Sequence, residues 1–284
     1  MSVEIVRDLR GLHSSIARYR NGPLNTAASL AIVPTMGAFH EAHEKLVIEA
    51  KRNADIVLAT IFVNPMQFGQ SEDFNKYPKS EEEDIRRLSA KGCDIIYIPT
   101  IENVYPEGFD LTINVPKLSS VLCGQKRPNH FEGVSTIVAK LLLQSGADYA
   151  VFGEKDYQQL LIIKSLVKNL DIPCHILPIE TIRDGNGLAI SSRNKYLNVE
   201  SKVIANNINK IMKSAVNEYK NVDIESTIKF VESNLLDAGI ENIDYIEIRD
   251  NNNLSVIDNS DKSNARLFIA VYIKDTRLID NIKL

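Results

Sequence analysis

Short apolar runs alternate with segments of helical periodicity along the first two thirds of the chain, and this alternation constrains the fold more than any other feature. The runs are rich in β-branched residues, and the first and third stop at Pro34 and Pro99. Continuous apolar runs are typical of strands buried on both faces, and strands that alternate with helices form right-handed βαβ units. The pattern therefore predicts an α/β fold with an open parallel sheet, whose five strands cover residues 30–33, 56–63, 94–98, 149–152 and 175–179.

Apolar residues spaced three or four apart predict helices over residues 1–20, after His43, and over 80–91, 134–143 and 157–169. The character of the chain changes after about Ile182. Helices near 199–219 and 223–238 are followed by strands at 245–248, at 267–273 and near Leu278, with a polar hairpin connection over 250–264. We therefore predict two domains, an α/β domain over residues 1–181 and a smaller C-terminal α+β domain over residues 182–284.

Composition limits the class of protein. The chain has 284 residues and a formal net charge of −4, which leaves room for two domains and gives no electrostatic footprint for nucleic acid. It has no run of about 18 apolar residues, and the charged residues among the first ten argue against a secretory signal. Three cysteines without a C-x-x-C pair disfavour a disulfide framework and a cysteine zinc site. We therefore expect a cytoplasmic protein with no membrane or nucleic-acid partner.

Polar clusters directly follow four of the predicted strands. They comprise residues 36–43, residues 64–69, residues 153–156 with Gln158 and Gln159, and residues 181–183 with 190–194. Ligands of open α/β sheets bind outside the carboxyl ends of the strands. The clusters therefore predict a binding site along that edge of the sheet.

His40 and His43 stand at the start of a predicted helix, three residues apart, so their rings share one helix face. Two nitrogen ligands without an H-E-x-x-H motif make a weak metal site, and a pair of ordinary histidines is a second alternative. We favour phosphate contact, because a helix N-terminus offers free amide donors and the positive end of its dipole. One imidazole would then protonate or hydrogen-bond a leaving group.

The other clusters also allow plain structural interpretations. Residues 153–156 are either a solvated turn or a phosphate site, in which Lys155 supplies a charge and Asp156 a partner for a ribose or for the lysine. Residues 191–193 are a turn with its cap, or an anion cradle of two hydroxyls and a guanidinium. Gln67 and Gln159 are surface glutamines, or the amides of a pocket for a hydroxy acid.

Two further groups of charged residues keep their alternatives open. The acidic run over residues 81–84 is a solvated helix face or an outer-shell hold on a Mg²⁺ ion carried by nucleotide phosphates. Arg127 and His130 add positive charge over the cleft, or make a loop rigid.

Several stretches between residues 30 and 197 carry a resemblance to a known family: Pro34–Ala38, Ile61–Gly69, Glu72–Phe74 with Tyr77–Pro78, Arg127–Val134, Phe152–Leu160 and Gly187–Asn194. In this order they resemble the pantoate–β-alanine ligases, which belong to the H-x-x-H nucleotidyltransferase superfamily. The resemblance implies a Rossmann-like adenylate-forming domain, a smaller C-terminal domain and a homodimer. It also implies that (R)-pantoate reacts with ATP to give pantoyl adenylate and pyrophosphate, and that β-alanine then displaces AMP to give pantothenate.

The resemblance assigns roles to residues by position. The implied catalytic residues are His43, as proton donor, with His40, Lys155 and Arg193. Gln67, Gln159, Arg127 and His130 would bind substrate, and Asp84 would lie near Mg²⁺. The implied ATP-binding residues are Met36, Gly37, Ala38, Phe39, His40, Glu41, Ala42, His43, Gly153, Glu154, Lys155, Asp156, Ile182, Ile190, Ser191, Ser192 and Arg193.

The chain departs from the family pattern beside the second histidine. Ala42 stands where the family usually has glycine, and Glu44 with Lys45 stands where an apolar and a small residue are more usual. A glycine lets a nucleotide approach the backbone closely, so the methyl group of Ala42 is expected to weaken ATP binding modestly or to be absorbed by a small shift. Two other functions compete: another H-x-x-H nucleotidyltransferase, which leaves residues 64–69 and Gln159 unexplained, and a nucleotide sensor, which would release no pyrophosphate.

Overall fold

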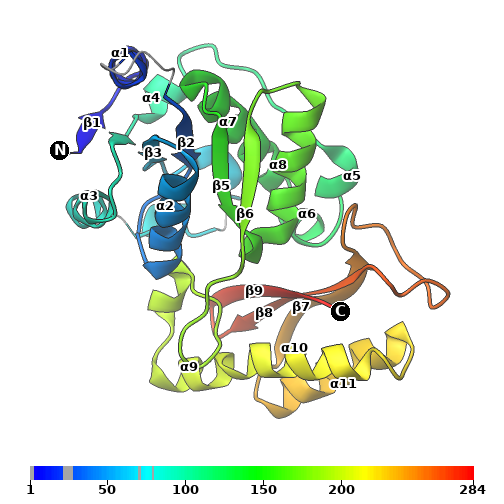
Figure 1. Ribbon diagram of the computed structural model, residues 1–284. Coiled ribbons are helices and arrows are strands. Elements are labelled where there is room, and N and C mark those ends of the chain that lie inside the picture. The colour runs from blue at the N-terminus through cyan, green and yellow to red at the C-terminus, as the bar shows by residue number, and fades with distance from the viewer. Residues whose placement is uncertain (1–2, 22–27, 70–71, 79) are drawn as a thin grey trace. The chain divides into compact units, whose positions relative to one another are not determined.

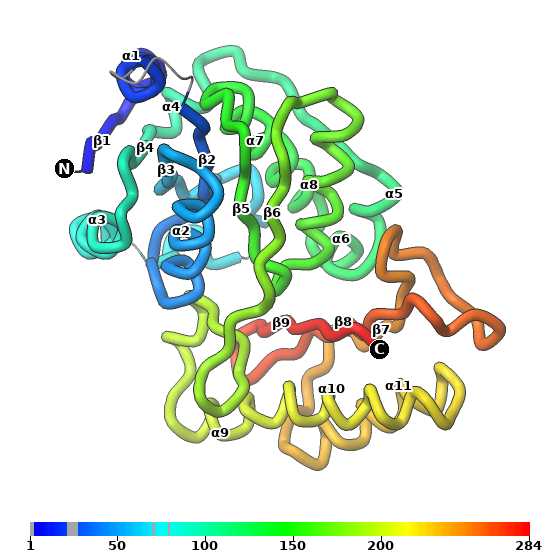
Figure 2. Tube along the Cα trace, viewed as in Figure 1, coloured from blue at the N-terminus to red at the C-terminus, as the bar shows by residue number. Residues whose placement is uncertain are grey.

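The computed structural model describes residues 3–21, 28–69, 72–78 and 80–284. Its contacts divide the chain into two compact units, whose elements are labelled in Figure 1 and traced in Figure 2. The first unit holds the described residues of 1–116, 127–154 and 162–179, and the second holds 117–126, 155–161 and 180–284. Two short segments from earlier in the chain thus group with the C-terminal part, and the domain boundary after residue 181 stays a prediction.

A six-stranded parallel sheet forms the centre of the first unit, in the order β1-β4-β3-β2-β5-β6. Its strands are β1 (Glu4–Val6), β2 (Leu30–Val33), β3 (Ile56–Thr60), β4 (Ile95–Tyr97), β5 (Tyr149–Gly153) and β6 (His175–Ile179). β2, β3 and β4 are buried along their whole length, as their unbroken apolar sequences predict. The prediction of an open parallel sheet is confirmed.

The N-terminal segment is where the prediction of a single helix over residues 1–20 is wrong. Glu4–Val6 form the edge strand β1, which pairs in parallel with β4, and helix α1 (Leu9–Arg20) begins only after it. Asp8 ends the strand segment and caps the helix, because its carboxylate accepts a hydrogen bond from the Gly11 N–H at 2.7 Å. A strand of three residues is too short to show a period, so the sequence predicted five strands where the sheet has six. Residues 1 and 2 lie outside the described residues.

Helices between the strands shield the sheet from solvent. Helix α2 (Glu41–Asn53) packs on β2, β3 and β5, and its buried Val47 and Ala50 join the apolar side chains of this face in one core. Further helices that begin in the first unit are α3 (Glu81–Ala90), α4 (Ile101–Val104) and α7 (His130–Ser145), with the 3₁₀ turns η1 (Pro65–Gln67), η2 (Phe74–Lys76) and η3 (Glu154–Asp156). Helix α8 (Tyr157–Asn169) follows η3, and α5 (Pro116–Ser119) and α6 (Cys123–Lys126) precede α7.

The chain leaves the middle of the sheet in two directions. From β2 it continues to β3 and β4 on one side, whereas β5 and β6 lie on the other side. β2 and β5 are direct neighbours, with Ala31 paired to Tyr149, so their carboxyl ends mark the topological switch point of the sheet. The loop over residues 34–40 follows β2 and therefore starts at the position where open α/β sheets bind ligands.

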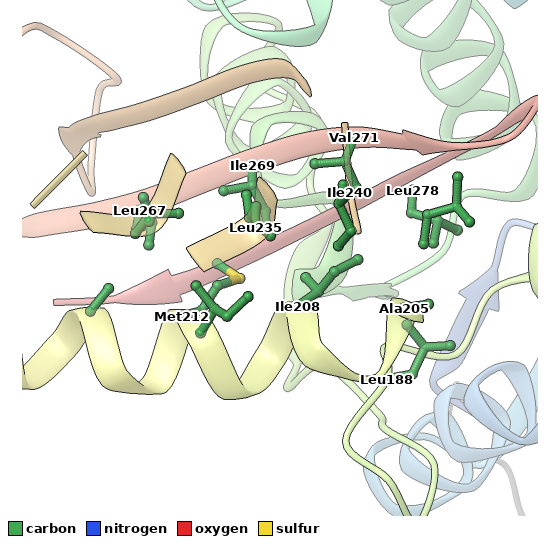
Figure 3. Close-up of a cluster of buried hydrophobic side chains, with 14 of the residues drawn as sticks. Leu188, Ala205, Ile208, Met212, Leu235, Ile240, Leu267, Ile269, Val271 and Leu278 are labelled. Carbon is green, nitrogen blue, oxygen red and sulfur yellow. The ribbon is translucent and has the colours of Figure 1, made fainter. Parts of the chain in front are cut away.

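The second unit contains a three-stranded antiparallel sheet, β7 (Asn242–Asp250), β8 (Ala265–Ile273) and β9 (Thr276–Lys283). Helices α9 (Val199–Ala205), α10 (Asn207–Glu218) and α11 (Ile224–Asp237) precede it, and η4 (Ser192–Tyr196) precedes them. Figure 3 shows Ile208 and Met212 of α10 directed toward Ile269 and Val271 of β8, in a core of buried apolar side chains. The predicted α+β character and the connection over 250–264 are confirmed, although the helix predicted over 199–219 is divided at Asn206.

None of the helices in the part of the chain that the structure describes has the length and apolar character needed to cross a membrane.

Candidate active site

The loop after β2 is held in an unusual conformation by helix α3. Gly37 and Ala38 both have positive φ, at 81° and 53°. The Asp84 carboxylate accepts hydrogen bonds from the Ala38 N–H at 2.9 Å and the Phe39 N–H at 2.8 Å, and Arg87 donates to the Phe39 carbonyl at 3.0 Å. Helix α3 therefore fixes the loop by accepting from two of its N–H groups and donating to one of its carbonyl groups. Because the Asp84 side chain is only 1% exposed, the interpretation of 81–84 as a solvated face holds for the first three residues alone.

Gly37 is required at its position for two reasons. Its φ lies in the left-handed region that favours glycine. A Cβ added there would also lie 2.9 Å from Asp84 Oδ2 and 3.2 Å from Ile61 Cγ2. A side chain would therefore push the anchoring carboxylate away from the loop.

The loop delivers the two histidines to the N-terminus of α2. His40 is the N-cap residue, and its ring stacks on that of His43 with centroids 4.0 Å apart and an interplanar angle of 20°. Phe39 packs against His43 at 4.9 Å and is 2% exposed. The paired imidazoles thus lie beside the free amides and the positive dipole end of a helix of 13 residues, which is an arrangement suited to an anion.

Glu44, one of the departures from the family pattern, is compensated inside the first unit. Its carboxylate accepts from Arg87 Nε at 2.8 Å and lies 3.1 Å from Lys91 Nζ, both on or directly after α3. Burial raises the pKa of Glu44, but the hydrogen bonds from Arg87 and Lys91 outweigh burial and hold the pKa below its usual value. The negative charge that Glu44 brings to the first turn of α2 is therefore matched by two cations.

Gln67, at the end of η1, has its amide group oriented by two neighbours. Its Oε1 accepts from Asn64 Nδ2 at 3.0 Å, and its Nε2 contacts Met36 Sδ at 3.1 Å. Asn64 is 1% exposed, and its Oδ1 accepts from the Tyr105 hydroxyl at 2.7 Å. The sequence pointed to Gln67 and missed Asn64 and Tyr105 as supports, although Asn64 lies in the same polar cluster.

Helix α7 packs against η1 without space between their backbones. Asn64 Nδ2 also donates to the Gly133 carbonyl at 3.1 Å. A Cβ added to Gly133 would lie 2.3 Å from the Met66 carbonyl oxygen, so only glycine permits this approach. This close contact fixes the position of η1 relative to helix α7, and with it the position of Gln67.

Arg127 and His130 form a chain of hydrogen bonds that ends at the Gln67 backbone. Arg127 makes a bidentate pair with Glu72, at 2.7 and 2.6 Å, and donates to His130 Nε2 at 2.8 Å. Since arginine only donates, Nε2 accepts, and the His130 Nδ1–H then donates to the Gln67 carbonyl at 2.8 Å. Burial raises the pKa of Glu72, but the Arg127 guanidinium outweighs burial and keeps the pKa below its usual value. This geometry favours the interpretation in which Arg127 and His130 make a loop rigid.

Several candidate residues of the second unit make contacts with near neighbours in the sequence. Lys155 Nζ lies 3.6 Å from Asp156 Oδ1. Ser191 is the N-cap of η4 and accepts from the Arg193 N–H at 3.3 Å, while the Ile190 N–H donates to the Ile182 carbonyl at 2.9 Å. Ser192 is buried and Gln159 is partly buried. Residues 36–43, 67, 84, 127, 130, 153 and 154 thus belong to the first unit, and residues 155, 156, 159, 182 and 190–193 belong to the second.

An open parallel sheet with a helix N-terminus and two histidines at its switch point defines an α/β protein of the doubly wound class. A profile described as "Pantoate-beta-alanine ligase" matches residues 4–283. The chain belongs to the pantoate–β-alanine ligase family.

Named relatives and solved structures agree with this assignment. A pantothenate synthetase of Ruegeria sp. (strain TM1040) is 43% identical over 89% of this chain and 91% of its own length. One from Paramagnetospirillum magneticum is 42% identical over 99% of this chain and 98% of its own. The crystal structure of pantothenate synthetase from Thermus thermophilus has a TM-score of 0.91 at 34% identity, with 99% of both chains covered. A Francisella tularensis pantoate-beta-alanine ligase, complexed with beta-gamma ATP and beta-alanine, has a TM-score of 0.80 at 33% identity, with 99% of this chain and 97% of its own covered.

Proposed function

We propose that this protein condenses (R)-pantoate with β-alanine to pantothenate at the expense of ATP. In the first step a pantoate carboxylate oxygen bonds to the α-phosphorus of ATP. The bond from that phosphorus to the bridging oxygen breaks, and its electron pair leaves with pyrophosphate. In the second step the β-alanine nitrogen bonds to the acyl carbon, AMP leaves with the electron pair of the broken C–O bond, and the nitrogen loses a proton.

The observation that carries this proposal is the loop that Asp84 locks at the end of β2. It sets two stacked imidazoles at the N-terminus of α2, where a polyphosphate would find amide donors and the helix dipole. We propose that His40 and His43 contact the phosphates and that His43 protonates or hydrogen-bonds the leaving pyrophosphate. The beta-gamma ATP and beta-alanine with which the Francisella tularensis relative is complexed support ATP and β-alanine as substrates of this chain.

Gln67 is proposed to hold pantoate, together with Gln159. An amide offers both a donor and an acceptor, so it can bind hydroxyl and carboxylate oxygens without forming a tight ion pair. Asn64 and Met36 already fix the direction of the Gln67 amide. Arg127 and His130 were expected to touch substrate; their bonds to Glu72 and to the Gln67 carbonyl support a positioning role for them instead.

Asp84 does not fit a direct ligand of Mg²⁺. Both of its carboxylate oxygens accept backbone N–H groups, and the side chain is 1% exposed. Within the described residues, no three His, Cys, Asp or Glu side chains gather as a metal site. A Mg²⁺ ion that accompanies ATP would be bound through the nucleotide phosphates, as is usual for this cation.

Lys155, Asp156 and the segment over residues 190–193 are proposed to serve ATP. A cation that meets the developing charge on pyrophosphate stabilises the transition state more than the ground state. Removing one such group commonly costs ~10²–10³-fold in rate. We also propose that the protein acts in the cytoplasm, and its three buried, free cysteines are consistent with a reducing compartment. We propose a homodimer as well, which sedimentation would test.

The decisive experiment measures pyrophosphate release from ATP and Mg²⁺ with (R)-pantoate, with and without β-alanine. We expect release that requires pantoate and becomes multi-turnover when β-alanine is added. Lys155→Ala should lower the rate ~10²–10³-fold while the fold is retained. A folded protein that binds ATP and releases no pyrophosphate with pantoate would refute the proposed function.

A further inference from the structure

Strand β9 carries two adjacent buried polar residues to which the proposed function assigns no role. Asp280 is 4% exposed and Asn281 is 5% exposed. Adjacent residues of a strand point to opposite faces of the sheet, so the two side chains extend in different directions. Burying an amide or a carboxylate is costly unless its hydrogen bonds are made, so the partners of these residues indicate what they hold.

Asn281 holds the backbone of the proposed catalytic lysine. Its Nδ2 donates to the Lys155 carbonyl at 2.9 Å, and its Oδ1 accepts from Arg266 Nη1 at 2.5 Å. Lys155 and Asn281 are 126 positions apart in the sequence and lie in the same unit. A buried side-chain amide thus joins strand β9 to the turn that carries Lys155.

Arg266 of β8 contacts the chain directly after the same turn, at Tyr157. Its guanidinium carbon lies 3.7 Å from the ring centroid of Tyr157, two residues after Lys155. Phe268, also on β8, lies 6.1 Å from that ring. Arg266 is 8% exposed and its Nε donates to Asn251 Oδ1 at 2.7 Å, so the guanidinium has a defined orientation. The turn is therefore fixed at the carbonyl before Asp156 and at the ring after it.

Asp280, on the other face of β9, also holds an earlier segment of the chain in place. It makes a bidentate pair with Arg183, at 2.6 and 2.9 Å, and Arg183 also donates to the Gly187 carbonyl at 3.2 Å. This segment leads to Ser191 and Arg193. One dipeptide of β9 thus anchors both stretches of the second unit to which nucleotide contacts are assigned.

We propose that Asn281 is a positioning residue, which places the Lys155 ammonium group for the adenylation step by fixing the Lys155 backbone. The inference rests on the proposed function, since it assigns a partner to Lys155 in that reaction. A lysine side chain has four rotatable bonds, so the ammonium group is placed well only if its backbone is fixed. The Lys155 side chain is 19% exposed and reaches toward Asp156, at 3.6 Å, which limits it further. A misplacement of about 1 Å can cost on the order of 10²-fold in rate.

The variant Asn281→Asp separates the two contacts of the amide. It keeps an acceptor for Arg266 and removes the donor to the Lys155 carbonyl. We expect kcat for pantoate-dependent pyrophosphate release to fall about tenfold to a hundredfold. The KM for ATP should change less than about threefold, because the lysine acts mainly on charge that develops in the transition state. Asn281→Ser, which leaves space for a water molecule, is the second variant if the aspartate prevents folding.

A double-mutant cycle distinguishes positioning from general damage. If Asn281 acts through Lys155, then Asn281→Asp should cause little further loss of kcat in the Lys155→Ala background. Val231→Ala is the matched control, because it removes buried volume from the core of the same unit without touching the turn. It should lower the melting temperature and leave kcat within about twofold at a temperature where all variants are folded.

The outcomes separate the two proposals. A wild type without pantoate-dependent release overturns the proposed function, and the assignment to Asn281 falls with it. An active wild type with an unchanged kcat in Asn281→Asp overturns only the positioning role. Equal losses from Asn281→Asp in the presence and absence of Lys155 also overturn the role, since they would show that the amide acts elsewhere.

Discussion

Replacing Asp84 by asparagine tests the structural argument for the loop at the switch point. The amide of the new side chain would offer one oxygen, which can accept from one of the two N–H groups of Ala38 and Phe39. Its NH₂ group would face the other N–H, so a donor would oppose a donor. The bonds that are now made, at 2.9 and 2.8 Å, lie in a site where Asp84 is 1% exposed.

The magnitude follows from these contacts. A hydrogen bond to a charged group contributes about 1.5–3 kcal/mol, and an unsatisfied buried donor costs a similar amount. Relaxation of Ala38 out of its left-handed conformation, at φ 53°, would recover about 1 kcal/mol. We therefore expect Asp84→Asn to lower the free energy of unfolding by about 2–5 kcal/mol, and Asp84→Ala, which loses both bonds, to lower it further.

The assay combines chemical denaturation with the affinity for ATP measured by calorimetry. Because the loop sets the histidines at the N-terminus of α2, ATP affinity should fall in both variants. Glu83→Gln is the matched control on the same helix: Glu83 is exposed and pairs with Arg86 at the surface, so its loss should cost less than about 0.5 kcal/mol. Asp84→Asn with wild-type stability and wild-type ATP affinity would refute the reasoning.

Three further predictions concern other contacts. The folded pKa of Glu72 is held below its ordinary value of 4.5, so its pair with Arg127 stabilises the protein fully above that pH, and this stability is lost as pH falls through the lowered pKa. The difference in unfolding free energy between wild type and Glu72→Gln should shrink accordingly, and a pH-independent difference would contradict this. Gly133→Ala should cost about 1–3 kcal/mol by overpacking against the Met66 carbonyl, whereas Gly185→Ala, with open space around it, should not; equal melting temperatures would exclude the close approach. Burial raises the pKa of Cys93 to about 12, so its thiol should resist iodoacetamide at about pH 8 until the protein is denatured, and rapid labelling of the native protein would argue against burial.

Much of the first unit was readable from local sequence. Apolar runs that stop at proline or at a polar cluster predicted β2 through β6, because buried parallel strands need unbroken apolar residues. The polar clusters after β2 and β3 were also readable, since open sheets leave the carboxyl ends of their strands to ligands. β1 escaped notice because three residues show no period.

The supports of the candidate site were not readable in this way. Asp84 stands in a charged run with the pattern of a solvated helix face, and only tertiary packing places its carboxylate under the N–H groups of Ala38 and Phe39. The charge of Arg127 and His130 and their place in the family motifs suggested a substrate contact. In the structure, Arg127 pairs with Glu72, and His130 donates to the Gln67 carbonyl. Each partner lies dozens of residues away, at a distance that a local pattern does not encode.

The sequence by itself determined the α/β class, the strands after the first and the family, because these depend on periodicity and on motifs within short windows. The tertiary structure decided which polar residues hold another residue in place. Asn281 is the clearest case: its 2.9 Å bond to the Lys155 carbonyl exists because β9 folds back beside a turn 126 residues earlier in the chain. Chain folding brings such pairs together through the burial of apolar surface elsewhere, so their identity is a property of the folded state.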